Sequence, residues 1–265
     1  MRILFASVAT SFLLACSPNQ PTDQQSEAAA SSSDNEQPQD SLTVPLTYLM
    51  GQFEPSEHPD FTVIDTKYAS RAGMYLRTDA YQDFQRMWEA AQADGVTLVI
   101  RSATRNFNSQ KGIWEAKWTG QRRIEGGQDA SVAFPDPATR ARMILKFSSM
   151  PGSSRHHWGT DIDLNNLTNE YFDEGEGKKI YDWLTAHAAE YGFCQPYTEK
   201  GPERPNGYNE ERWHWSYMPV SRPLTAQAER ELTDSMINGF QGSETAKMIG
   251  IVENYVLGIN DACRD

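Results

Sequence analysis

The chain has 265 residues, with 36 Asp and Glu against 24 Lys and Arg, a formal net charge of −12 and three cysteines. This length is sufficient for one hydrophobic core with a small accessory part. The acidic balance and the lack of a clustered Lys/Arg stripe exclude a nucleic-acid-binding protein. Three cysteines exclude a disulfide-dense scaffold and a four-cysteine zinc site.

Residues 1–15 have the pattern of a signal peptide. The positive start, Met1-Arg2, precedes a mostly apolar run that is too short to span a bilayer. The run ends in Leu13-Leu14-Ala15-Cys16, which resembles the lipobox of bacterial lipoproteins and implies lipid attachment at Cys16. An ordinary signal sequence with an incidental cysteine is the alternative. No later apolar run approaches ~20 residues, so we expect membrane contact only through the N-terminal lipid.

Residues 16–42 are predicted to be the lipidated cysteine and a disordered tether. From residue 17 onward they lack aromatic and basic side chains, and such a segment cannot bury enough apolar surface to offset its ordering entropy. We expect a globular domain over residues 43–222 and a C-terminal helical extension over residues 223–265. Because serine rather than aspartate follows Cys16, we expect an outer-membrane anchor facing the periplasm if the envelope is Gram-negative.

The globular part alternates helical and extended patterns. In residues 78–94, Tyr81, Phe84 and Trp88 recur at helical spacing, with Thr78 as the expected N-cap. The other predicted helices are 108–118, 138–147, 175–191, 224–240 and 244–257, and the predicted strands are 96–101, 160–164 and 213–217. Interleaved helices and short strands fit an α+β fold better than a doubly wound parallel sheet.

Cys194 and Cys263 are the thiols that remain after maturation. In an exported protein a disulfide between them would tie the C-terminal tail to the domain. Two buried free cysteines are the alternative, and the sequence leaves both open.

Two short segments carry a concentration of metal-ligating residue types. A catalytic zinc needs three protein ligands and one open position for water, and His156, Asp163 and His214 can supply that set. Glu211, three residues before His214, is the carboxylate that could take a proton from the zinc-activated water. Each histidine alone would more often be a structural residue, so it is the combination that favours a metal site.

These segments resemble a known family. Ser154-x-His156-x-x-Gly159-x-x-x-Asp163 and Glu211-x-Trp213-His214 are similar to the SxHxxGxAxD and ExWH signatures of the zinc D-alanyl-D-alanine carboxypeptidases of the VanY type, which are related to the VanX-type dipeptidases. Upstream, Ser102-Ala103-Thr104-Arg105 with Gln110 resembles the SGYRS…Q segment of that family. The three motifs occur in the family's order over about residues 70–220.

The resemblance implies a small antiparallel sheet that carries the zinc site and is flanked by helices, as in Hedgehog and D-Ala-D-Ala peptidase-like folds. Arg105 would hold the peptide's carboxylate or the developing oxyanion, because guanidinium is a bidentate donor; Arg101 is its rival. The other implied roles are zinc ligation for His156, Asp163 and His214, the general base for Glu211, and substrate contacts for Gln110 and Ser154.

Three positions depart from the family pattern. Asp161 replaces an alanine near the metal, Arg212 replaces a proline, and Ser216 replaces the arginine of the usual WHWRY run. His157 has no role in the pattern, and we expect it to be exposed or to lie behind the ligands. The ligand set is intact, which favours activity.

The implied function is a zinc peptidase that trims D-alanine-terminated stem peptides of peptidoglycan, acting as a monomer. L,D-carboxypeptidase and D-Ala-D-Ala dipeptidase are the alternatives within the enzyme class. A non-catalytic module that binds wall peptide on the same fold is the alternative outside it. Loss of Glu211 or of a ligand would favour that module, and none is lost.

Overall fold

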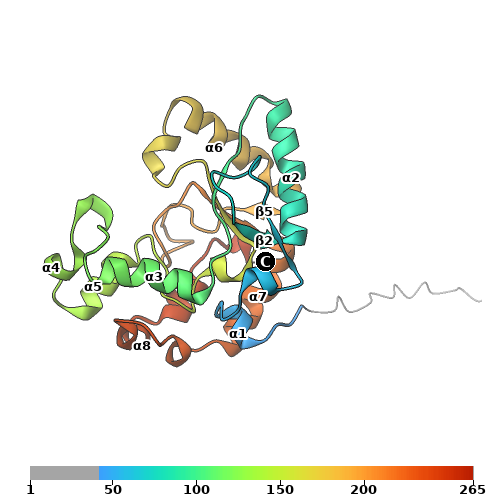
Figure 1. Ribbon diagram of the computed structural model, residues 1–265. Coiled ribbons are helices and arrows are strands. Elements are labelled where there is room, and N and C mark those ends of the chain that lie inside the picture. The colour runs from blue at the N-terminus through green and yellow to red at the C-terminus, as the bar shows by residue number, and fades with distance from the viewer. Residues whose placement is uncertain (1–41, 265) are drawn as a thin grey trace, which may run out of the picture. The chain divides into compact units, whose positions relative to one another are not determined.

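The structure, a computed structural model, describes residues 42–264 (Figure 1). The predicted signal peptide, Cys16 and all but the last residue of the predicted tether lie outside this range. The α-helices of the described part are α1 (Leu46–Leu49), α2 (Thr78–Ala93), α3 (Phe107–Trp118), α4 (Ala130–Ala133), α5 (Pro137–Ile144), α6 (Gly175–His187), α7 (Met218–Glu231) and α8 (Ala246–Ile249). None of the helices in residues 42–264 has the length and apolar character that a membrane crossing requires.

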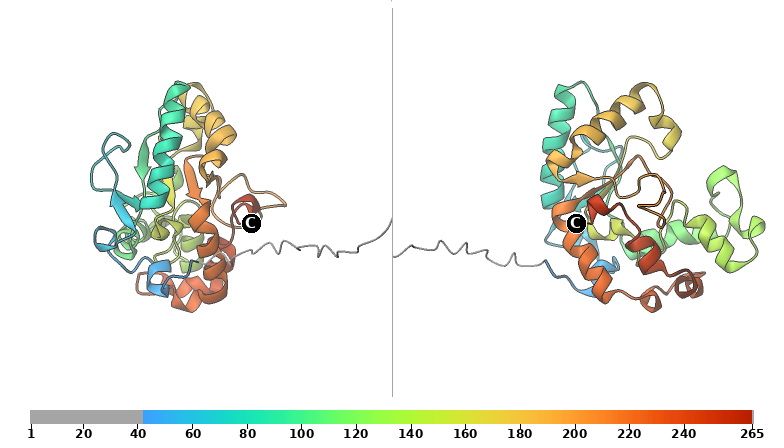
Figure 2. Two further views of the ribbon diagram at one scale, coloured as in Figure 1. Left: turned by 90° about the vertical axis from the view of Figure 1, so that its right-hand side faces the viewer. Right: turned by 180° about the vertical axis from the view of Figure 1, so that it is seen from behind.

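The strands form two antiparallel sheets. They are β1 (Phe61–Val63), β2 (Tyr75–Arg77), β3 (Ile100–Ser102), β4 (Asp161–Leu164), β5 (Phe193–Cys194) and β6 (His214–Tyr217). β1 pairs with β2, and the four-stranded sheet has the order β3-β4-β6-β5. Helices α2 and α6 lie side by side, while α3, α4 and α5 pack together on the other side of this sheet (Figures 1 and 2). The predicted α+β class and small antiparallel sheet are confirmed.

The middle of the larger sheet has a polar face and an apolar face. β4 and β6 pair in register, Asp161 with Ser216 and Asp163 with His214, and side chains at alternate positions point to the same face. The residues between them, such as Ile162, belong to the hydrophobic core. The strand predicted at residues 160–164 alternates polar and apolar residues, which is typical of a half-buried strand, but all of β4 is buried. Its polar face lies beneath other chain segments rather than in solvent.

The predicted strand at residues 96–101 is shorter and later than expected. The side chain of Asn165 donates through Nδ2 to the carbonyl oxygen of Thr97 at 2.7 Å and accepts from the backbone N–H of Val99 at 3.2 Å. These bonds occupy backbone groups that a longer strand would pair in the sheet, so β3 is confined to Ile100–Ser102.

The C-terminal region departs most from the sequence prediction. Helix α7 begins at Met218, before the predicted start at residue 224, and continues through Pro223. The domain boundary predicted between residues 222 and 223 therefore falls inside α7. The helix predicted over residues 244–257 is broken at Gly250, whose φ of 69° is left-handed, into α8 and a π-helical turn at Val252–Val256.

A disulfide fastens the C-terminal end of the described chain to the sheet. It joins Cys194 of the edge strand β5 to Cys263, with Cα atoms 5.6 Å apart. Of the two alternatives that the sequence leaves open, the structure has the bonded one.

Candidate active site

The three predicted metal ligands converge on the polar face of the β4–β6 pair. His156, Asp163 and His214 are buried, and each offers a ligand atom within 4.8 Å of the others. His156 Nε2 lies 3.4 Å from Asp163 Oδ2, and His214 Nδ1 lies 3.0 Å from Asp163 Oδ1. Two strands and one turn thus bring together residues from separate parts of the sequence.

Each imidazole is oriented through its other nitrogen. His156 Nδ1 is 2.9 Å from the carbonyl oxygen of Ala103, and His214 Nε2 is 2.8 Å from Asp161 Oδ2. These acceptors fix the rotation of the rings and leave His156 Nε2 and His214 Nδ1 facing Asp163. Two oriented imidazoles and one carboxylate are a donor set that fits zinc.

A glycine turn places His156 beside Asp163. Gly159 ends the 3₁₀ helix Arg155–Trp158 with a φ of 73°. A Cβ atom at this position would lie 2.3 Å from Cε1 of Phe61. Both the left-handed backbone and the close contact require glycine, so this turn fixes the distance between the two ligands.

Burial and ion pairing set the protonation of the ligands. Burial lowers the pKa of His156. Burial also acts to lower the pKa of His214, but the hydrogen bonds with Asp161 and Asp163 outweigh it and raise that pKa to about 9. Burial acts to raise the pKa of Asp163, yet His156 and His214 hold it well below its usual value. The raised pKa of His214 favours its protonated form at neutral pH, and a metal bound at Nδ1 would have to displace that proton.

Glu211 is buried next to the ligands. Its Oε2 lies 3.5 Å from His214 Nδ1. Burial raises the pKa of Glu211 to about 8, and the positive charge of His214 opposes this rise. A carboxyl group whose pKa lies near neutrality is suited to proton transfer at this position.

Arg105 is held beside Asp163 by three contacts. Its Nε donates to Gln110 Oε1 at 2.9 Å, and its Nη1 donates to Ser102 Oγ at 2.6 Å and lies 3.6 Å from Asp163 Oδ2. Arg101 is exposed on β3. Of the two arginines considered from the sequence, the structure places Arg105 in the site.

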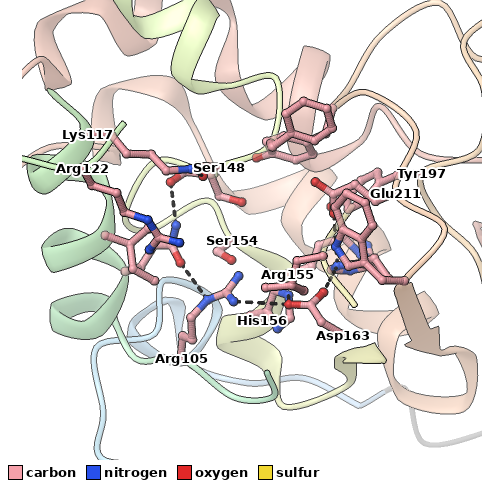
Figure 3. A pocket seen from close by; sticks show the side chains of 18 residues that line it. Arg105, Lys117, Arg122, Ser148, Ser154, Arg155, His156, Asp163, Tyr197 and Glu211 are labelled. Carbon is pink, nitrogen blue, oxygen red and sulfur yellow. Dashed lines mark hydrogen bonds and ion pairs between the residues drawn. The ribbon is translucent and has the colours of Figure 1, made fainter. Parts of the chain in front are cut away.

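The predicted site residues line one pocket between α3 and the sheet (Figure 3). Ser154 lies in the middle of this view, and its buried Oγ has no hydrogen-bond partner among residues 42–264. That hydroxyl is available to a ligand, as expected of a substrate-contacting residue. Gln110 also lines the pocket; it is buried, and its Oε1 accepts from Arg105 Nε.

Several pocket residues were missed by sequence reasoning. They are Lys117, Arg122, Ser148, Arg155 and Tyr197. For Lys117 a signal was present, because it follows Gln110 by seven residues on a predicted helix and so shares its face. The others come from loops or, in the case of Arg155, from a short 3₁₀ helix, and the sequence carries no periodic pattern for these segments.

His157 is completely buried, so its predicted exposure is wrong and its position behind the ligands is correct. Its Nδ1 is 2.6 Å from the carbonyl oxygen of Arg105, and its Nε2 accepts from the backbone N–H of Gly152 at 3.0 Å. Burial lowers the pKa of His157 to about 3, although its bond to Arg105 opposes this. The neutral ring therefore joins the backbone that carries Arg105 to the turn that precedes the histidine pair.

Two curated proteins are similar to this chain in sequence. The chain is 27% identical over 177 residues to the putative carboxypeptidase YodJ of Bacillus subtilis (strain 168), covering 64% of this chain and 56% of that protein. It is 26% identical over 136 residues to a D-alanyl-D-alanine carboxypeptidase of Enterococcus faecalis (strain ATCC 700802 / V583), covering 51% and 46%. The chain thus spans about half the length of these curated relatives.

Two solved structures are also similar to the chain. The LdcB LD-carboxypeptidase is 19% identical with a TM-score of 0.49, covering 77% of this chain and 81% of that chain. VanYB in complex with D-alanine-D-alanine is 22% identical with a TM-score of 0.42, covering 60% and 80%. Residues 73–220, more than half of the chain, match the VanY family, described as D-alanyl-D-alanine carboxypeptidase. The chain therefore belongs to the VanY family.

Proposed function

We propose that this protein is a zinc-dependent carboxypeptidase that hydrolyses D-alanine-terminated stem peptides of peptidoglycan. The observation that carries the proposal is the convergence of His156, Asp163 and His214 in one pocket with Glu211 and Arg105. Membership of the VanY family and the similarity to the E. faecalis D-alanyl-D-alanine carboxypeptidase support the choice of substrate.

The residues of the pocket would have separate roles in hydrolysis. His156, Asp163 and His214 would hold zinc, which supplies a Lewis acid and lowers the pKa of water towards about 7. Glu211, beside His214, would accept the proton of the attacking water and later pass it to the leaving amine. Arg105, fixed beside Asp163, would donate to the oxygen of the scissile carbonyl as negative charge develops there.

Hydrolysis of defined muropeptides, followed by mass spectrometry, tests this function. We expect loss of a single D-alanine from a peptide that ends in D-Ala-D-Ala, and only from protein that contains zinc. Release of the intact dipeptide would identify a D-Ala-D-Ala dipeptidase, and cleavage of tetrapeptides alone would identify an L,D-carboxypeptidase. Binding without cleavage of any muropeptide would contradict the enzymatic proposal and support a wall-binding module.

We also propose that Cys16 is lipidated and that the tether holds the domain at the outer membrane, facing the periplasm. The support is the sequence Leu13-Leu14-Ala15-Cys16-Ser17 and the polar segment after it. At roughly 5–6 Å × √n, a flexible segment of about 26 residues has a mean reach of about 25–30 Å. Fractionation of cells that carry wild type or Cys16→Ala tests the anchor. Identical distribution of both proteins in the soluble fraction would show that the protein is not anchored.

A further inference from the structure

The side chain of Gln195 joins the two ends of the loop that leads to Glu211. Gln195 directly follows β5, and it is buried. Its Nε2 donates to the carbonyl oxygens of Tyr197 and Glu211, each at 3.2 Å. The backbone N–H of Glu211 in turn donates to the carbonyl oxygen of Tyr197 at 2.9 Å. The Gln195 amide therefore closes the loop of residues 197–211 at its base.

The donors and the acceptor of the Gln195 amide all have partners. A glutamine side chain has two N–H donors and one carbonyl oxygen. The donors bind the two loop carbonyls, and Oε1 accepts from the hydroxyl of Tyr181 on α6 at 2.9 Å. Rotation of this buried amide would leave polar groups without partners, which is costly. The bond to α6 therefore holds the amide in the orientation that closes the loop.

The C-terminal tail, residues 260–263, holds the backbone around Gln195. The backbone N–H of Asn260 donates to the carbonyl oxygen of Pro196 at 2.8 Å, and Nδ2 of Asn260 donates to the carbonyl oxygen of Gln195 at 3.4 Å. The disulfide joins the same tail to the last residue of β5, just before Gln195. Three consecutive residues are thus fixed by a tail that lies beyond the part of the chain that matches the VanY family.

Glu211 depends on such support because it lies on a loop. It precedes β6 by three residues and belongs to no helix or strand, whereas Asp163 and His214 lie on paired strands. A site residue on a loop is held less precisely than one on a strand. A proton acceptor must lie within hydrogen-bond reach of the proton that it takes, and a displacement of about 1 Å can cost about 10²-fold in rate. The position of the Glu211 backbone therefore matters for the role proposed for its side chain.

We propose that Gln195 is a positioning residue for Glu211, and that the C-terminal tail fixes Gln195 in place. Gln195 does not line the pocket, so it acts through the backbone of Tyr197 and Glu211, which do. The inference rests on the proposed function, because it takes Glu211 as the general base. Its consequence is that turnover depends on a part of the chain outside the family match.

Hydrogen–deuterium exchange of the full protein, measured without substrate, tests the positioning apart from turnover. Gln195→Met keeps the length of the side chain and removes its hydrogen bonds, and Tyr181→Phe removes only the bond to Oε1. Gln227→Met is the matched control, because Gln227 is also buried and its amide bonds to the backbone of Val44. The readout is the exchange rate of the Glu211 amide in peptides that span it.

Two further variants test the tail. Replacement of both cysteines, Cys194→Ser with Cys263→Ser, removes its covalent tie, and Asn260→Ala removes its side-chain bond and leaves the disulfide in place. For all variants, zinc content and steady-state hydrolysis of a muropeptide that ends in D-Ala-D-Ala give kcat per bound zinc.

We expect Gln195→Met to speed exchange at Glu211 by about tenfold or more, with smaller increases in Tyr181→Phe and in both tail variants. Gln227→Met should stay within about twofold of wild type. In Gln195→Met, kcat per bound zinc should fall by about tenfold or more with KM within about twofold, because a general base acts in the transition state.

Equal exchange at Glu211 in Gln195→Met and wild type would overturn the positioning role, and so would an equal increase in Gln227→Met. Loss of zinc that accounts for all of the lost turnover would also overturn it. Unchanged exchange at Glu211 in both tail variants would overturn the part assigned to the tail. Failure of the wild-type protein to hydrolyse any muropeptide would contradict the proposed function, while the exchange rates still decide whether Gln195 positions Glu211.

Discussion

Ser216 Oγ donates a hydrogen bond of 2.7 Å to Asp161 Oδ1 across the β4–β6 pair. These are two of the three positions at which the sequence departs from the family pattern, and the structure makes them partners. Arg155 joins them, with Nε 3.2 Å from Asp161 Oδ2 and Nη2 2.9 Å from Ser216 Oγ. The same Asp161 oxygen lies 2.8 Å from Nε2 of His214. The extra carboxylate therefore orients the ring of one predicted metal ligand, His214.

Asp161→Asn should weaken zinc binding about 10–100-fold, because loss of a carboxylate that orients a ligating histidine typically costs this much. Competition with a chromophoric chelator measures the affinity, and thermal unfolding shows whether the variant is folded. Ser216→Ala is the matched control, since Ser216 contacts the other oxygen of Asp161. Equal zinc affinity of the Asn variant and wild type would show that Asp161 serves only to neutralise Arg155.

Glu211→Gln should keep its zinc and lower kcat by about 10²–10⁴-fold, because the change removes the proton acceptor but keeps the shape of the side chain. Zinc content by elemental analysis and muropeptide hydrolysis measure the two effects. Near wild-type turnover with full zinc content would mean that another residue is the base, and Asp161 would be the first to examine.

Arg105→Lys should lower kcat by about 10²-fold, because a compact ammonium cannot reproduce the bonds of a guanidinium held by Gln110 and Ser102. Arg101→Lys should leave kcat and KM within about twofold, since Arg101 is exposed outside the pocket. Steady-state kinetics of the two variants on one peptide makes the comparison. A larger loss of kcat in Arg101→Lys than in Arg105→Lys would show that Arg101, not Arg105, has this role.

The stability of the metal-free protein should fall as pH rises from 6.5 to 8. The pKa of His214 is raised to about 9 and that of Glu211 to about 8, so the folded state retains protons that the unfolded chain has released. Each group lowers the free energy of unfolding by up to about 1.4 kcal/mol per pH unit. The pKa values of His156 and Lys117 are lowered, so these groups make the protein more stable as pH rises. His156 has this effect below pH 6.5, and Lys117 has it mainly above pH 8.

Urea unfolding in the presence of a chelator measures this pH dependence. Glu211→Gln should reduce the slope by about half. Zinc-saturated wild type should lose the part of the decline that comes from His214, because the metal replaces its Nδ1 proton. A metal-free protein that is equally stable at both pH values would contradict the raised pKa values of these two groups.

Local sequence patterns predicted the elements in which buried residues recur at one regular spacing. Residues 78–94 carry an apolar stripe, and α2 buries Tyr81 and Phe84 as expected. The convergence of His156, Asp163 and His214 was predictable because a zinc site restricts both residue type and spacing. The β4 strand was assigned correctly, but its full burial depends on segments distant in sequence that cover its polar face.

Other features could not be predicted from local sequence patterns. Asn165 shortens β3 through bonds to the backbone of Thr97 and Val99. Gly250 interrupts an apolar periodicity that otherwise predicts a continuous helix over residues 244–257. The cationic end of the pocket is formed only when Arg122, which follows α3, is brought beside Lys117, so composition and motif spacing did not reveal it.

The disulfide also has a consequence for the connectivity of the chain. The bond between Cys194 and Cys263 closes a covalent ring with a sequence separation of 69 residues. Glu211 and His214 belong to this ring, whereas His156 lies outside it. Loop closure of this size stabilises a protein by about 4 kcal/mol in the chain-entropy model. A metal bound by all three ligands would be a second cross-link, between the ring and the preceding part of the chain. Reduction would therefore open the ring, whereas metal depletion would remove the cross-link between the ring and the preceding part of the chain.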